Sequence, residues 1–205
     1  MTRNIIAILR GVQPDEAVDM AAVLLGSGIT KIEVPLNSPN PFESIEKIVH
    51  AFGDQALIGA GTVLEVEEVH RVHGIGGKLV VSPNFDPAVI QATKMAGLLS
   101  YPGVMTPSEC FAALRLGADG LKFFPGNLIG PVGMKAIRAV LPRETEVLAV
   151  GGAGPENFAE WKEAGANGFG IGSALYKPGS SLADVQSRAA HIVALYDQVL
   201  SLIHI

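Results

Sequence analysis

The chain is poor in the features that mark several functional classes. Its 205 residues contain a single cysteine, Cys110, which excludes an internal disulfide and fits a reducing compartment. No apolar run approaches the roughly 18 residues that a membrane span needs. Only 17% of the residues are charged, the net charge is -5, and the basic residues are scattered rather than clustered. We therefore expect neither a membrane nor a nucleic acid among the partners of this protein.

Targeting and metal-binding signals are also missing. The apolar run before Arg10 has only five residues, too few for the apolar region of a signal peptide, so we expect a cytoplasmic protein. His70 and His73 lie three apart with no further histidine or cysteine near them, which favours a solvated helix face over a metal site. The phosphate-binding P-loop and the Gly-x-Ser-x-Gly nucleophile motif are absent as well.

What the chain does contain is a repeated helix-to-strand pattern over a 48% hydrophobic sequence with no linker-like segment. This predicts one domain over residues 1–205. Prolines stand where helices should begin, with capping residues before several of them. Glycines in the left-handed conformation should end the helices. The glycines are Gly28, Gly53, Gly76, Gly97, Gly117 and Gly165, and the prolines are Pro14, Pro41, Pro87, Pro107, Pro131 and Pro155.

Eight short apolar runs alternate with the predicted helices. Strands this apolar are typical of a parallel sheet covered on both faces, and eight such units predict a (β/α)8 barrel. A doubly wound open sheet is the alternative, but the first strand is not followed by a glycine-rich nucleotide turn. The expected strands are residues 5–9, 31–36, 56–60, 79–81, 98–101, 120–124, 147–150 and 168–171.

Lys122 lies inside the apolar sixth strand, between Leu121 and Phe123. Burying an ammonium group is costly, so this lysine should be paired with an acid, extend to solvent, or have lost its proton. A neutral amine is a nucleophile, and the third alternative predicts a Schiff-base lysine.

Glu33 interrupts the second strand in the same way. Because side chains alternate along a strand, Ile32 and Val34 should face the helices and Glu33 the barrel interior. Strands two and six lie opposite each other in an eight-stranded ring, so Glu33 and Lys122 should face each other. They are either an ion pair or a catalytic acid/base and nucleophile.

Glycine-rich turns follow the last two strands, where barrels commonly bind phosphate. Backbone amides at Gly151 and Gly152, and at Gly172 and Ser173, predict such a site, with a short helix starting at Ser173. The remaining polar residues at strand ends include Thr62, a candidate hydroxyl donor or helix cap. Arg10 is suited to a carboxylate or to a surface ion pair.

Several motifs together resemble the class I 2-keto-3-deoxy-6-phosphogluconate / 2-keto-3-deoxy-6-phosphogalactonate aldolase family, from the first strand to the last. They are AILRG at 7–11, IEVPLNSP at 32–39, GAGTVL at 59–64, SPN at 82–84, LKFFP at 121–125, VGG at 150–152 and GS at 172–173. The resemblance implies a homotrimer that uses no cofactor or metal. It also implies a phosphorylated sugar acid substrate, which is cleaved to pyruvate and D-glyceraldehyde 3-phosphate.

The resemblance also implies a role for each matching residue. Lys122 would form the Schiff base and Glu33 would transfer protons. Thr62 and Pro83 would seat the pyruvate end beside Phe124. The two glycine pairs, Gly151-Gly152 and Gly172-Ser173, would hold the phosphate.

Three positions in the family pattern concern the choice of substrate. Gluconate-type members carry arginine where this chain has Asn37, and threonine where it has Val150; galactonate-type members use an arginine at the position of Arg10 and a valine at that of Val150. The galactonate is therefore the expected substrate, with the gluconate as alternative. The alternative functions are a sugar-phosphate isomerase or epimerase with the same barrel, and a phosphate-binding barrel without activity.

Overall fold

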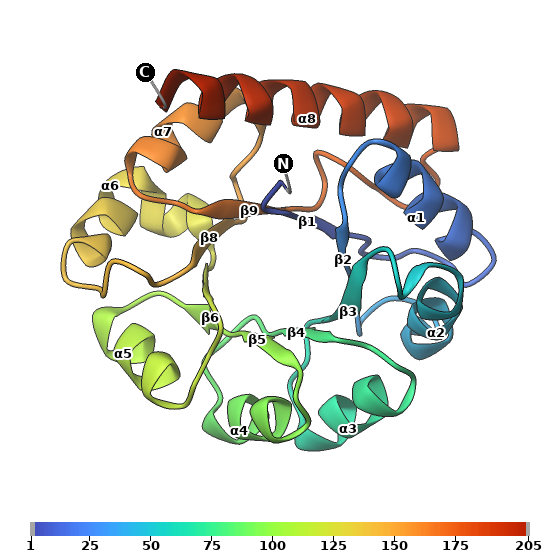
Figure 1. Cartoon of the computed structure of the whole chain (residues 1–205), viewed down its shortest axis with the longest axis horizontal. Helices are drawn as coiled ribbons and strands as arrows, with labels where there is room; N and C mark the ends of the chain where they lie inside the picture. Colours follow the sequence, from blue (N-terminus) through green and yellow to red (C-terminus); the bar gives the residue numbers. More distant parts are fainter. Residues whose placement is uncertain (1–2, 204–205) are drawn as a thin grey trace.

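The computed structural model describes residues 3–203, which form a ring of parallel strands surrounded by helices (Figure 1). Neighbouring strands follow the order β5-β4-β3-β2-β1-β9-β8-β7-β6. The predicted (β/α)8 barrel is thereby confirmed. The strands are β1 (Ile5–Ile8), β2 (Lys31–Pro35), β3 (Leu57–Gly61), β4 (Leu79–Val81), β5 (Leu99–Tyr101), β6 (Gly103–Val104), β7 (Leu121–Phe123), β8 (Val147–Val150) and β9 (Gly168–Ile171).

The fifth strand position is divided in two by Pro102. Proline has no N–H to donate to a neighbouring strand, so the regular ladder stops there. Its carbonyl still accepts a 2.9 Å hydrogen bond from the Lys122 amide. On either side of it, β5 pairs with β4 and β6 pairs with β7. The barrel therefore closes through one continuous segment of chain that contains both β5 and β6. The sequence predicted a single strand there, over residues 98–101.

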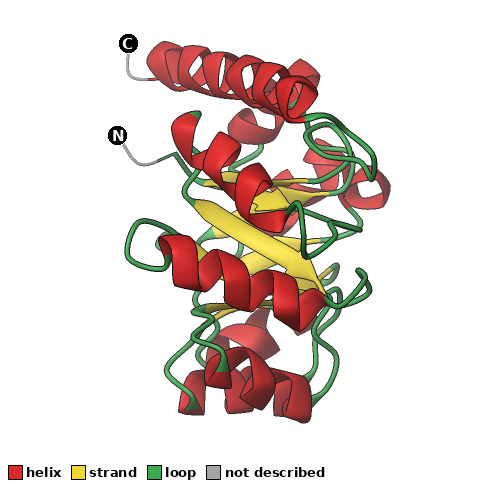
Figure 2. Cartoon of the chain, turned by 90° about the vertical axis from the view of Figure 1, so that its right-hand side faces the viewer, coloured by secondary structure: helices red, strands yellow, loops and turns green. Residues whose placement is uncertain are grey.

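Helices cover the outside of this ring, and in the side view the strands lie among them (Figure 2). No helix within residues 3–203 is both long and apolar enough to cross a membrane. The helices are α1 (Ala17–Gly26), α2 (Pro41–Phe52), α3 (Val66–Gly74), α4 (Pro87–Met95), α5 (Pro107–Arg115), α6 (Gly126–Arg138), the 3-10 helix η1 (Pro155–Asn157), α7 (Phe158–Glu163) and α8 (Leu182–Ile203).

The predicted helix starts are confirmed at α2, α4, α5 and η1, each of which begins with a proline. Asp86, the capping residue before Pro87, makes the expected cap, because its carboxylate accepts hydrogen bonds from two amides of α4. The helix start predicted at Pro14 is wrong, since α1 begins at Ala17 after a turn. Pro131 lies within α6, next to Gly130, whose φ of 65° and ψ of 166° interrupt the helix.

Five of the six glycines predicted to end helices have the left-handed conformation, with φ between 73° and 100°. Gly53 does not: its φ is -59°, so an ordinary helical turn ends α2. A glycine after an apolar pattern thus identified the ends of α1, α3, α4, α5 and α7. The left-handed conformation predicted for Gly53 was wrong.

Two apolar layers follow from side-chain alternation along the strands. Ile32, Val34, Leu121 and Phe123 belong to the layer between strands and helices. A smaller layer fills the barrel and includes Ile6, Ile8, Leu79, Tyr101, Leu148 and Val150. Because their neighbours in sequence face outward, Glu33 and Lys122 face the barrel interior.

Polar side chains close the end of the barrel where the strands begin. Glu146 accepts 3.1 Å hydrogen bonds from the Asn4 side chain and from the Tyr101 hydroxyl. Lys31 donates to the Asn4 side-chain oxygen at 2.7 Å. This network leaves the opposite end, where the strands finish, as the open mouth of the barrel.

Candidate active site

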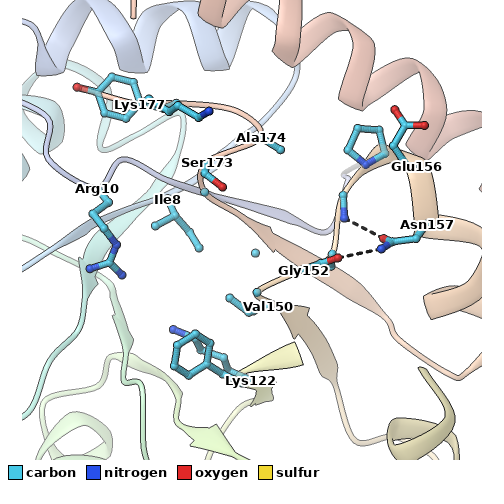
Figure 3. Close-up of a pocket in the computed structure, with 18 of the residues that line it drawn as sticks. Ile8, Arg10, Lys122, Val150, Gly152, Glu156, Asn157, Ser173, Ala174 and Lys177 are labelled. Atoms are coloured by element: carbon cyan, nitrogen blue, oxygen red, sulfur yellow. Dashed lines mark hydrogen bonds between the residues drawn. The ribbon is translucent and has the colours of Figure 1, made fainter. Parts of the chain in front are cut away.

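The carboxyl ends of the strands surround a pocket of about 770 Å³, shown in Figure 3. Eight residues that the sequence singled out line it, namely Arg10, Lys122, Phe124, Val150, Gly151, Gly152, Gly172 and Ser173. Glu33, Thr62 and Pro83 are not part of this lining. The pocket therefore joins the predicted Schiff-base lysine to both predicted glycine turns.

Lys122 lies at the inner end of the pocket on β7 and is only 4% exposed. Its Nζ is 4.8 Å from the centre of the Phe124 ring. Burial lowers the pKa of Lys122, the positive charge of Arg10 lowers it further, and the negative charge of Glu33 opposes both. The amine is thus shifted towards its neutral, nucleophilic form.

Glu33 lies on β2 and is 2% exposed. Burial raises its pKa, while the charges of Lys122 and Arg10 act in the opposite direction. It makes no ion pair with Lys122 within 4 Å, and its buried Oε2 accepts no hydrogen bond from the residues that the structure describes. The two groups therefore influence each other's pKa without forming an ion pair.

Arg10 follows β1 and extends into the mouth of the pocket (Figure 3). Its Nη1 donates a 2.6 Å hydrogen bond to the side-chain oxygen of Asn37, which follows β2. This bond fixes one side of the guanidinium group and leaves the other donors of the fork available to an anion.

The turn after β8 supplies backbone amides to the pocket. Gly151 and Gly152 have φ values of 86° and 80°, which only glycine adopts easily. Asn157 holds this turn: its amide donates to the Gly152 carbonyl at 2.8 Å, and its oxygen accepts from the Gly154 amide at 3.0 Å (Figure 3). Within the described chain, the amides of Gly151 and Gly152 donate to no other group, so both are available to a ligand.

The turn after β9 has a related form. The Gly172 carbonyl accepts hydrogen bonds from the amides of Leu175 at 2.8 Å and Tyr176 at 3.0 Å. These bonds make a single turn, so the helix predicted to start at Ser173 does not form. The Ser173 and Ala174 amides nevertheless remain without acceptors in the described part of the chain, as a phosphate-binding turn requires.

Tyr176, Lys177 and Pro178 also line the pocket, and the sequence analysis did not single them out because they lie in an irregular segment after the last strand. The Tyr176 hydroxyl donates to Glu16 at 2.6 Å, and Pro178 packs so closely on Gly11 that a side chain there would lie 2.6 Å from it. These contacts tie the segment to the loop after β1. Lys177, held between them, lines the upper edge of the pocket near Ser173 (Figure 3).

Thr62 and Pro83 lie at the ends of neighbouring strands, outside the lining of the pocket. Thr62 directly follows β3, is half-buried and has a φ of 57°, an uncommon value for a residue other than glycine. Pro83 is half-buried after β4, and its carbonyl lies so close to Gly103 that a methyl group added there would overlap it. Among the described residues, no three histidine, cysteine, aspartate or glutamate side chains form a group that could hold a metal ion.

The chain matches the family model of KDPG and KHG aldolases over residues 1–189, and it belongs to that family. A Rhizobium meliloti (strain 1021) protein named probable 2-dehydro-3-deoxy-6-phosphogalactonate aldolase is 51% identical over 97% of this chain and 94% of its own length. The 2-dehydro-3-deoxy-6-phosphogalactonate aldolase of Escherichia coli (strain K12) is 45% identical over 96% of each chain.

Solved structures agree with this assignment. The one described as native KDPGal superposes with a TM-score of 0.96 at 44% identity, covering 98% of each chain. A KDPG aldolase of Legionella pneumophila, with pyruvate captured as a covalent carbinolamine intermediate, gives a TM-score of 0.80 at 27% identity over 97% of this chain and 94% of its own.

The opposed charges inside the barrel predict a stability effect. We expect the double variant Glu33→Gln, Lys122→Met to be at least as stable as the wild type, because it removes two ionisable groups whose burial is unfavourable. Lys122→Met alone should be less stable than the double variant by about 1–3 kcal/mol, since the buried carboxylate loses its opposite charge. Urea unfolding measures both differences. A double variant less stable than either single variant would contradict this interpretation.

Proposed function

We propose that this aldolase cleaves 2-dehydro-3-deoxy-6-phosphogalactonate to pyruvate and D-glyceraldehyde 3-phosphate through a Schiff base on Lys122. The observation that carries the proposal is the buried amine of Lys122, with its lowered pKa, at the inner end of a pocket bordered by two turns of free amides. An amine needs both an uncharged form and access to the substrate to attack a ketone. The names of the Rhizobium and Escherichia relatives support the choice of substrate.

In the first step the Lys122 amine attacks the C2 ketone. The ketone oxygen takes up a proton to give a carbinolamine, which loses water to form an iminium. The carbinolamine captured in the Legionella relative supports this route. The iminium then accepts the electron pair of the C3–C4 bond when that bond breaks.

Glu33 would accept and then donate a proton during cleavage. As a carboxylate it takes the proton of the C4 hydroxyl, directly or through a water, so that glyceraldehyde 3-phosphate leaves with a new aldehyde. It then returns the proton to C3 of the enamine, and hydrolysis releases pyruvate and the free amine. Burial raises the pKa of Glu33, and a raised pKa suits a group that must both accept and donate.

The two ends of the substrate would be held by different chemistry. The free amides of Gly151, Gly152 and Ser173 suit the phosphate, and Lys177 adds a positive charge at that end of the pocket. Together with Gly172, these residues make up the proposed phosphate site.

The carboxylate would bind the guanidinium of Arg10, which Asn37 orients. Thr62, Pro83 and Phe124 would seat the pyruvate portion. Phe124 already borders the Lys122 amine, and the other two lie at the ends of adjacent strands on the same rim.

Val150 bears on the choice between the two C4 epimers. It lies at the end of β8 and lines the pocket, only 6% exposed. Its apolar side chain offers no hydrogen bond to a C4 hydroxyl, which supports the galactonate. The gluconate is the second candidate, because an apolar wall rejects a displaced hydroxyl only weakly.

The proposal extends to the state of the protein in the cell. We propose a cytoplasmic homotrimer of single-domain chains, which family resemblance and the lone buried cysteine support. The exposed apolar side chains of Leu128 and Val132 on α6, 69% and 85% accessible, offer a surface that a neighbouring subunit could cover.

Reduction with borohydride in the presence of pyruvate tests the covalent step. We expect an irreversible mass gain of one reduced pyruvate adduct on Lys122, found by peptide mass spectrometry, together with loss of activity. Lys122→Met should gain no adduct and should not turn over substrate. Active enzyme that remains unmodified at Lys122 after this treatment would reject the Schiff-base route.

Pyruvate release from the two C4 epimers tests the substrate. We expect a higher kcat/KM for the galactonate under identical conditions. Val150→Thr, which keeps the shape and adds a hydroxyl, should move the ratio towards the gluconate by about tenfold. Phe111→Leu, a change in α5 away from the pocket, serves as the control. A wild-type preference for the gluconate would overturn the assignment of the substrate while leaving the aldolase chemistry in place.

A further inference from the structure

We propose that Gly61 is a positioning residue for Glu33: the space left by its missing side chain holds the Glu33 carboxylate at the place where it must exchange a proton. The inference rests on the proposed function, because it assigns the position of the group that moves the proton in that reaction. Neither the predicted roles nor the resemblance gave Gly61 any function.

The geometry of β2 and β3 places the two residues together. Gly61 is the last residue of β3 and pairs with Pro35, two residues beyond Glu33 on β2. A methyl group added at Gly61 would overlap Oε2 and Cδ of Glu33 and lie 2.9 Å from Oε1. All three of its nearest neighbours are therefore atoms of one side chain, and that side chain is Glu33.

Other glycines on the strands meet different neighbours. A methyl group at Gly59, on the same strand, would overlap the backbone carbonyl of Leu79. At Gly103 it would overlap the backbone of Pro83. Those two glycines allow strands to approach each other, whereas Gly61 makes room for a carboxylate.

Backbone conformation does not explain the glycine at this position. Gly61 is not among the glycines with positive φ, so an alanine could adopt its backbone angles. Space for the side chain of Glu33 is then the remaining requirement. Because the end of a flexible side chain can move while the strand cannot, an alanine at this position should displace the carboxylate and leave the barrel in place.

The oxygen next to Gly61 is also the one that lacks a partner. Oε2 of Glu33 is buried and accepts no hydrogen bond from the described residues. A buried acceptor without a donor is unfavourable unless a water or a ligand supplies one. Gly61 thus borders the oxygen that is free to accept a proton, and a methyl group there would displace that oxygen.

The kinetic test is Gly61→Ala. We expect kcat of the cleavage to fall by about tenfold to a hundredfold, up to the lower limit of what general acid-base catalysis contributes, because the carboxylate is displaced and not removed. KM should change less than threefold, and borohydride should still trap pyruvate on Lys122, because imine formation does not use the displaced group. Gly74→Ala, at the end of α3 where a methyl group would meet nothing within 4 Å, is the matched control. An unchanged kcat in Gly61→Ala would overturn the proposal.

A thermal cycle tests the contact without using activity. Glu33→Ala removes the atoms that a methyl group at Gly61 would overlap. We therefore expect Gly61→Ala to lower Tm in the wild type and to have a clearly smaller effect, or none, in the Glu33→Ala background. An equal fall in Tm in both backgrounds would show that Gly61 is needed by the sheet and not by the Glu33 side chain, and the proposal would be wrong. Failure of the wild type to cleave the sugar acid would instead reject the proposed function and leave this contact standing.

Discussion

The site depends on one energetically unfavourable arrangement, which is the burial of the Lys122 amine in the apolar interior of a closed barrel. Water would keep this group charged, and the walls of the barrel exclude most of it. The same burial acts on Glu33 with the opposite effect on its pKa, so both groups are shifted towards their neutral forms. A reactive amine is therefore a consequence of where the strand places it.

The barrel makes this burial possible through the alternation of side chains. Leu121 and Phe123 face the helices and fix β7 in place, which leaves Lys122 no direction but inward. Ile32 and Val34 do the same for Glu33 on β2. Apolar residues of the outer layer thus hold the two ionisable groups of the inner layer in place, and their packing offsets the cost of burying those groups.

Regular features of the fold could be predicted from the sequence because each has a local cause. The helix starts at Pro41, Pro87 and Pro107 depend on the proline itself, and the inward direction of Lys122 depends on its two neighbours. The strand break at Pro102 also has a local cause, the proline itself. In the sequence, however, a break after which the chain continues in the barrel looks the same as the end of a short strand.

Contacts between distant segments could not be predicted in this way. The hydrogen bond between Tyr176 and Glu16 joins loops from opposite ends of the chain, and neither residue has a pattern around it. The fit of Glu33 against Gly61 was hidden for a different reason: glycine in GAGT is explained equally well by a tight turn, and only side-chain positions distinguish the two explanations. Family resemblance supplied roles for residues, but not the reason for this glycine.

The state of the Lys122 amine is the most direct test of this account. Lysine labelled with carbon-13 at Cε reports the protonation of each amine by NMR, and Lys122→Met identifies the signal of Lys122. We expect Lys122 to titrate below the roughly 10.4 of an ordinary lysine and below the exposed lysines of the same protein. A Lys122 that titrates with those exposed lysines, or above them, would contradict the claim that burial makes it a nucleophile.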